Sequence, residues 1–204
     1  MTAAFRRLTI FAACFLTGCG TGDLEQSARD RTQVYVFESF KNPVSTTNAT
    51  MGGATSQLTA VGTKISIIPR LIPVRECNIP RTYCAEGIAK PVVAVLLNKL
   101  THEAATVSVD VTYDIDRRQT IEARTLTSSS VATDEIDPSV DEIKGHAEFQ
   151  KTVVLPFGEI RRIKLPNGIS VGVCVAKPSR YELSLDGPCN ADPYGQNLEN
   201  AQPL

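Results

Sequence analysis

Short stretches in which hydrophobic and polar residues alternate recur along most of this chain. The clearest is TVSVDVTYDID (106–116), where valine, tyrosine and isoleucine occupy every second position. A period of two places the apolar side chains on one face of an extended strand, which predicts a half-buried β-strand. The run PVVAVLL (91–97) is continuously apolar, a pattern typical of a strand buried on both faces.

Further candidate strands are spread along the chain, and no stretch keeps a helical period for three turns. They are VYVF (34–37), LTAVGTKISII (58–68), RQTIEARTL (118–126), HAEFQKTVVLP (146–156), EIRRIKL (159–165), ISVGVCVAK (169–177) and YELSL (181–185). The sequence PNG (166–168) predicts a tight hairpin turn, because Asn-Gly supplies the positive φ angles that such a turn requires. Many short strands separated by turns predict an all-β, antiparallel sandwich.

Two segments resemble bacterial immunoglobulin-like and fibronectin-III-like domains. FQKTVVLPFGEIRRIKLP is similar to their late hairpin, in which a Pro-Gly-type turn joins two alternating strands. VAVLLNKLTHEAATVSVDVTYD resembles their B–C strand region. The resemblance implies an immunoglobulin-like antiparallel β-sandwich, and it implies no ligand.

The first residues have the pattern of an export signal. MTAAFRR carries two arginines and no acidic residue, and LTIFAACFL is shorter than the roughly 20 apolar residues that a membrane-spanning helix needs. The next residues, LTGC (16–19), resemble the lipobox of bacterial lipoproteins. This resemblance implies that the thiol of Cys19 is acylated, that the chain is cut before it, and that the acyl chains anchor the protein in a membrane. An ordinary secretory signal is the alternative, but an A-x-A-like cleavage site is missing from the expected position.

The lipobox resemblance also implies a location. In Gram-negative lipoproteins, aspartate after the cysteine tends to retain the protein in the inner membrane, and this chain has Gly20 there. We therefore expect an outer-membrane anchor with the protein facing the periplasm. The expected organisation is a signal peptide at 1–18, a lipidated N-terminus with tether, loop and one short strand candidate at 19–57, a β-sandwich domain at 58–186 and a C-terminal tail at 187–204.

Four cysteines remain once Cys14 has left with the signal and Cys19 has taken the lipid. An even number in an exported chain predicts two disulfides. In ISVGVCV the apolar residues share one face, so Cys174 lies on the opposite face and cannot easily bridge through the core. It is predicted to pair with Cys189 in a tail that crosses the outside of the sheet. Cys77 and Cys84 are then predicted to pair within their own loop.

The loop RECNIPRTYCAEG (75–87) is one candidate for a partner-binding surface. A disulfide holds such a loop rigid and lowers the ordering cost of binding, and Tyr83 is expected to be exposed in it. Alternatively, the disulfide only stabilises an inserted loop that binds no partner.

The segment TDEIDPSVDEIKGHAE (133–148) is the second candidate surface. It is predicted to be a solvated acidic loop, with Asp134, Asp137, Asp141 and Glu142 as possible contacts for a partner. Its spacing matches no EF-hand, so calcium is not expected. His102 and His146 are far in sequence from every cysteine, so no zinc site and no cofactor are expected either.

Charge argues against nucleic acid as a partner. Removing Arg6 and Arg7 from the 21 basic residues leaves 19, against 22 acidic residues, and no basic patch is evident.

One motif could indicate catalysis. GISVG (168–172) fits G-x-S-x-G, but Ser170 is followed by a predicted strand where a nucleophile elbow has a helix, and both histidines precede it. We therefore assign no catalytic residue. The expected role is binding or structural support in an envelope assembly with a protein partner; an envelope hydrolase and a small-ligand carrier are the alternatives.

Overall fold

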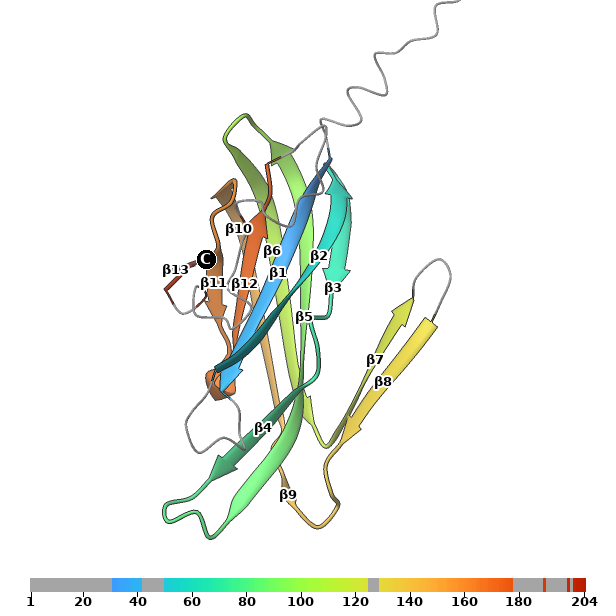
Figure 1. The fold of residues 1–204 in the computed structure, drawn as a ribbon, viewed down its shortest axis with the longest axis vertical. Helices are drawn as coiled ribbons and strands as arrows, with labels where there is room; N and C mark the ends of the chain where they lie inside the picture. The colour runs from blue at the N-terminus through green and yellow to red at the C-terminus, as the bar shows by residue number, and fades with distance from the viewer. Residues whose placement is uncertain (1–30, 42–49, 125–128, 178–188, 190–197, 199) are drawn as a thin grey trace, which may run out of the picture.

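The computed structural model describes residues 31–41, 50–124, 129–177, 189, 198 and 200–204, which are built almost entirely from β-strands (Figure 1). The all-β, antiparallel prediction is confirmed. The signal peptide, Cys19, the tether and the YELSL candidate lie outside the described residues.

Two sheets make up the main body. Sheet A has the order β13-β11-β12-β1-β2, and in sheet B the order is β10-β6-β5-β3, with β4 and β9 also paired to β5. The strands of sheet A are β1 (Arg31–Lys41), β2 (Thr50–Ala60), β11 (Arg161–Lys164), β12 (Ser170–Val175) and β13 (Gln202–Pro203). Those of sheet B are β3 (Lys64–Ile67), β4 (Ile72–Cys77), β5 (Cys84–Leu100), β6 (Ala104–Asp116), β9 (Asp141–Glu142) and β10 (Gly145–Pro156). The pairs β11–β13 and β5–β9 are parallel, and each spans two residues per strand.

A separate two-stranded hairpin, β7 (Arg118–Arg124) and β8 (Ser129–Glu135), projects beside the body (Figure 1). Its base packs on the body through Ile121, which contacts the small cluster of Leu71, Ile88 and Ile136.

The core lies between the two sheets and is formed mainly by β-branched side chains. Sheet A contributes Val34, Val36, Ile163, Val171, Val173 and Val175, and sheet B contributes Ile65, Ile67, Val93, Val95, Leu97, Val107, Val109 and Val111. Along β6 every second residue is buried, as the alternation predicts. Each such side chain contributes roughly 1.5–3 kcal/mol when it leaves water, which makes this shared cluster the main stabilisation of the body.

The run 91–97 departs from the expectation of burial on both faces. It is the middle of the long strand β5, in which Val93, Val95 and Leu97 are fully buried while the residues between them are half-buried. Only one face of the strand therefore packs on sheet A.

The sandwich begins earlier than predicted, so the boundary at residue 58 is wrong. β1 lies between β12 and β2 inside sheet A, and residues 50–57, expected to be loop, pair with β1 in register. The predicted strand at 58–68 is in fact two elements, divided by a turn in which Gly62 has a φ of 81°. Main-chain pairing, and not apolar burial, holds β2 in place, which is why its hydrophobic pattern is weak.

The turn at 166–168 is confirmed: Asn167 and Gly168 have φ angles of 57° and 72°, and they join β11 to β12. The expected hairpin across PFG (156–158) is wrong, because β10 belongs to sheet B and β11 to sheet A. The strands β5 and β6 pair directly within one sheet, whereas the B and C strands of immunoglobulin domains lie in different sheets.

The described residues near the C-terminus, Cys189, Leu198 and 200–204, pack on the body. Cys174 faces away from the main core, as predicted, and forms a disulfide with Cys189. Leu198 packs on the same outer face with only 1% of its surface exposed. β13 pairs with β11, and Lys151 of β10 donates to the main-chain oxygen of Leu204. The end of the chain thus links the edges of the two sheets.

Candidate partner-binding site

The two candidate surfaces meet at one end of the molecule. We call residues 77–84, the turn between β4 and β5, the tip. It lies beyond the packed body, at the opposite end from the start of β1 (Figure 1). The acidic segment, residues 134–142, reaches the same end through β9.

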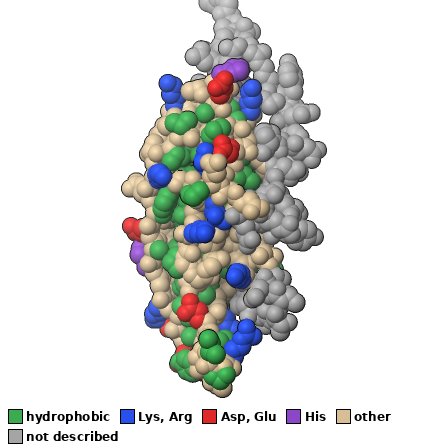
Figure 2. Space-filling model, turned by 90° about the vertical axis from the view of Figure 1, so that its left-hand side faces the viewer, with side chains coloured by type: hydrophobic (Ala, Val, Ile, Leu, Met, Phe, Trp, Pro, Cys, Tyr) green, Lys and Arg blue, Asp and Glu red, His purple; other side chains and the backbone are tan. Residues whose placement is uncertain are grey.

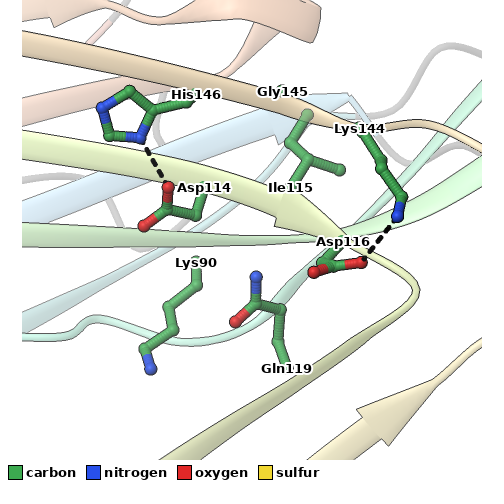
Figure 3. Close-up of a pocket in the computed structure, with 8 residues that line it drawn as sticks. All are labelled: Lys90, Asp114, Ile115, Asp116, Gln119, Lys144, Gly145 and His146. Carbon is green, nitrogen blue, oxygen red and sulfur yellow. Dashed lines mark hydrogen bonds and ion pairs between the residues drawn. The ribbon is translucent and has the colours of Figure 1, made fainter.

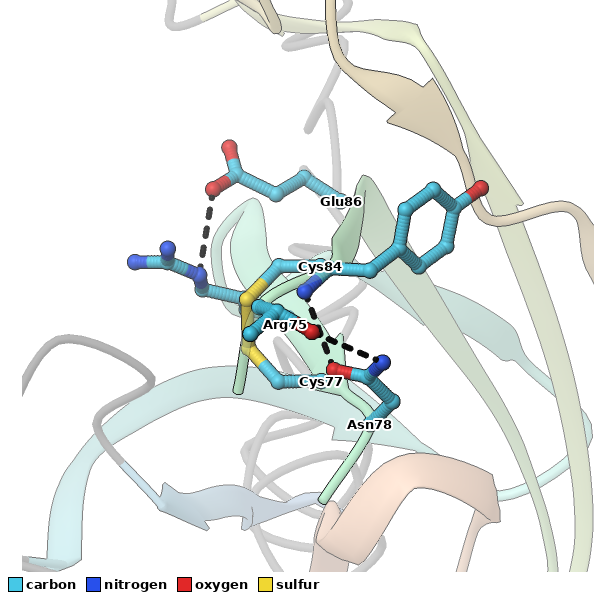
Figure 4. Close-up of a disulfide and its surroundings, with 7 residues drawn as sticks. Arg75, Cys77, Asn78, Cys84 and Glu86 are labelled. Atoms are coloured by element: carbon cyan, nitrogen blue, oxygen red, sulfur yellow. Dashed lines mark hydrogen bonds and ion pairs between the residues drawn. A yellow bond between two sulfur atoms is a disulfide. The ribbon is translucent and has the colours of Figure 1, made fainter. Parts of the chain in front are cut away.

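The tip is braced from within. Cys77 and Cys84 are paired across β4 and β5 and form a disulfide, as predicted (Figure 4). Asn78 makes three cross-turn hydrogen bonds: its N–H donates to the Tyr83 carbonyl at 3.0 Å, its Oδ1 accepts from the Tyr83 N–H at 2.9 Å, and its Nδ2 donates to Thr82 Oγ1 at 3.3 Å. Such bonding fixes the conformation of the turn before any partner binds.

The side chains at the tip are unusually exposed for apolar residues. Ile79 is completely exposed, and Tyr83 is 55% exposed, in line with the expected exposure of Tyr83. Ile79 is followed by a cis proline, Pro80, and by Arg81 with a φ of 70°. A fully exposed isoleucine in a fixed turn gains free energy only when another surface covers it.

The base of the tip is tied to both sheets. Arg75 of β4 lies 3.4 Å from the Glu86 carboxylate on β5 (Figure 4). The Asn167 side chain in the β11–β12 turn donates to the Glu76 carboxylate and accepts from the buried Tyr113 hydroxyl. The tip is therefore an extension of the folded body.

β9 joins the acidic segment to the tip. Asp141 and Glu142 pair in parallel with Ala85 and Glu86, directly after Cys84 in β5. The pKa of Tyr83 is raised, mainly because its hydroxyl faces the Asp141 carboxylate. The structure thus brings Tyr83 and Asp141 together, although they are 58 positions apart in the sequence.

The description of the acidic segment as one solvated loop is wrong. Asp134 and Glu135 belong to β8, where they pair with Gln119 and Arg118 of β7. Asp137 accepts hydrogen bonds from the N–H and the hydroxyl of Ser139, which lower its pKa.

Arg117 ties the acidic segment to the start of β7. Its side chain donates to the carbonyls of Asp137 and Val140, and its N–H donates to Glu142 Oε1 at 2.7 Å. Glu142 also lies 3.3 Å from the Lys144 ammonium group. Glu142 is therefore the carboxylate of the segment that Arg117 and Lys144 balance.

A polar groove of about 590 Å³ lies on the outer face of sheet B, beside β7 (Figure 3). His146 sits there between two carboxylates, with Nδ1 2.6 Å from Asp114 and Nε2 3.2 Å from Glu148. These bonds raise the pKa of His146, Asp114 being the larger cause. Sequence reasoning missed this cluster, because it depends on the register that sets Asp114 opposite His146.

The charged groups of this groove have partners within the chain. Lys144 lies 4.0 Å from Asp116, and the Lys90 ammonium donates to the Thr120 carbonyl. Both nitrogens of His146 face carboxylates, and both carboxylates favour the doubly protonated form of the imidazole.

Ser170 is a strand residue, opposite Ser39 of β1 and Lys164 of β11. Within the described part of the chain, no three His, Cys, Asp or Glu side chains gather as metal ligands do. No helix among the described residues has the length and apolarity to cross a membrane. Figure 2 shows acidic and basic side chains interspersed over one face of the protein, without a large area of one sign.

Comparison of the chain with protein-family models, with curated proteins and with solved structures found no match. The fold and the site geometry therefore carry the functional argument.

Proposed function

We propose that this chain is a lipid-anchored protein of the bacterial cell envelope that binds a protein partner through its tip. The anchor is Cys19 of the lipobox-like LTGC, and the outer membrane, facing the periplasm, is the expected location. Two disulfides fit an oxidising compartment of this kind.

The exposed, braced tip is the observation that carries the binding role. Ile79 and Tyr83 give it an apolar contact surface, and the disulfide with the Asn78 hydrogen bonds fixes its shape. A protrusion that is already ordered loses little conformational entropy on binding, so most of its contact energy contributes to affinity. A shallow protein pocket is the natural complement of such a protrusion.

The position of the tip is consistent with an anchored binder. β1 starts at the opposite end of the body from the tip (Figure 1). A lipid joined through residues 19–30 would therefore leave the tip directed away from the membrane. An immunoglobulin-like class for the sandwich stays a prediction, since β5 pairs with β6 within one sheet.

Site-specific photo-crosslinking in intact cells tests the proposal. A photoreactive residue at Ile79 should give a discrete crosslinked protein band, which substitution of Tyr83 by alanine weakens. Val131 on β8 is the matched control, because it is also an exposed apolar residue, at 66%, on a projecting hairpin. Equal crosslinking from both positions, or none from Ile79, would contradict a role for the tip.

A further inference from the structure

The outer edge of β2 differs from every other strand edge that the structure describes. β2 is the terminal strand of sheet A, with all eleven residues in register with β1 on one side. Its sequence, TMGGATSQLTA, contains no charged residue and no proline. Met51 and Leu58 on this strand are 41% and 51% exposed.

The other edge strands carry the residues that normally prevent strands from pairing with another chain. β3 and β10 contain lysine, β4 contains proline and arginine, β9 is acidic, β13 is a two-residue strand with proline, and both strands of the β7–β8 hairpin are charged. Charges and prolines at edges suppress unwanted pairing. Their absence from β2 alone marks this edge as one that accepts a further strand.

We propose that β2 pairs with β2 of a second copy of this chain, in antiparallel orientation, joining two five-stranded sheets into one. This inference is independent of the anchor and of the tip. At one end of the strand Arg70 already donates to the Gly52 carbonyl, so the pairing is centred on residues 54–58.

The composition of β2 favours a second copy over other occupants. Antiparallel self-pairing sets each residue opposite another residue of the same strand, and an uncharged strand brings no like charges together. A centre at Ser56 would place Leu58 opposite Ala54 of the second copy, where the small side chain leaves room. The segment before β1, residues 20–30, in contrast contains four charged residues, Asp23, Glu25, Arg29 and Asp30, and has no apolar alternation.

Cysteine crosslinking tests the geometry. Residues directly opposite in an antiparallel pair have Cα atoms about 4.5–5.5 Å apart, a distance that a disulfide can span. Single cysteines placed in turn at residues 54, 55, 56 and 57 of the full-length chain should give a disulfide-linked dimer at one central position, with the yield falling on both sides. Ser130→Cys, at an exposed position on the charged strand β8, is the control and should stay monomeric.

Sedimentation equilibrium of the purified full-length chain tests the association itself. We expect a reversible dimer. Thr55→Lys sets two ammonium groups near each other across the new pair, and should raise the dimer dissociation constant about tenfold or more. Ser130→Lys should leave that constant unchanged. A monomer at every soluble concentration, or a dimer that Thr55→Lys does not weaken, overturns the proposal.

Discussion

The carboxylate of Glu38, in the middle of β1, accepts a 2.7 Å hydrogen bond from Nε of Arg70, which lies between β3 and β4. Glu38 is 2% exposed, and its Oε2 has no hydrogen-bond partner among the described residues. Arg70 also donates to the Gly52 carbonyl and lies over the Phe40 ring. This pair links the β3–β4 connection of sheet B to two strands of sheet A.

Glu38 should make stability depend on pH. Burial raises its pKa above the usual 4.5, and the opposing charge of Arg70 only partly offsets this. Because the folded state keeps this proton to higher pH than the unfolded chain does, the resulting stabilisation is present below the unfolded pKa and is lost as pH rises through the folded pKa. Glu38→Gln should therefore reduce the fall in unfolding free energy between pH 4.5 and neutrality. Urea titrations measure this, with Glu103→Gln, an exposed change, as control; an unaltered pH dependence contradicts it.

Arg70→Met should destabilise the protein by about 2–3 kcal/mol at neutral pH, because it leaves a buried carboxylate without its counter-charge. The loss should be smaller at acid pH, where Glu38 is protonated. Urea titrations of the Arg70→Met variant at both pH values measure the loss. A loss caused by altered packing would be the same at both pH values, whereas a loss caused by the missing counter-charge would not.

Gly53→Ala should disturb the same pair. A Cβ at Gly53 would overlap Arg70 Nη2 and Glu38 Oε1. We expect a loss of about 1–3 kcal/mol, as for other overpacked sites. Gly145→Ala is the control, since its nearest neighbour would be 3.8 Å away, and it should change stability by less than about 0.5 kcal/mol. Equal effects of the two changes in thermal unfolding would rule out the overlap as the cause.

Replacing both Cys174 and Cys189 by alanine should cost about 3 kcal/mol, the stabilisation expected for a loop with a 15-residue separation. The C-terminal residues should then leave Tyr35 and Phe37, so tyrosine fluorescence and protease sensitivity near the C-terminus should change together. Replacing Cys77 and Cys84 by serine should cost about 2 kcal/mol and leave that region protected. A peptide map showing either cysteine pair exchanged would contradict both expectations.

NMR titration of His146 should give a midpoint above the ordinary 6.5, because Asp114 and Glu148 both favour the charged ring. Asp114→Asn should lower the midpoint more than Glu148→Gln does. If neither substitution changes the titration midpoint of His146, the two carboxylates do not face the imidazole ring in solution.

The proposed anchor makes a direct prediction. Cys19→Ser removes the thiol that would be acylated, so the variant should remain unprocessed or appear in the soluble fraction, and it should no longer partition into detergent. Unchanged fractionation with membranes would place the attachment elsewhere.

The sequence was most informative where side chains alternate across a packed sheet. The alternation in β6 and the outward face of Cys174 were readable because burial imposes a period of two on them. β2 and β8 could not be predicted from the pattern of hydrophobic residues, since main-chain pairing holds these strands while most of their side chains are polar and exposed. The contacts of Arg117 with Asp137 and Glu142, and of His146 with Asp114, depend on corners and registers that no local pattern encodes.

The strand β5 runs without interruption from Cys84 at the tip to Val93 and Val95 in the core. A partner that pulled on Ile79 would therefore load β5 along its own length. The main-chain hydrogen bonds that join β5 to β4 and β6 lie across the direction of this force. They would therefore bear the load together, and would not break one after another. The protrusion is thus mechanically continuous with the most deeply buried part of the protein.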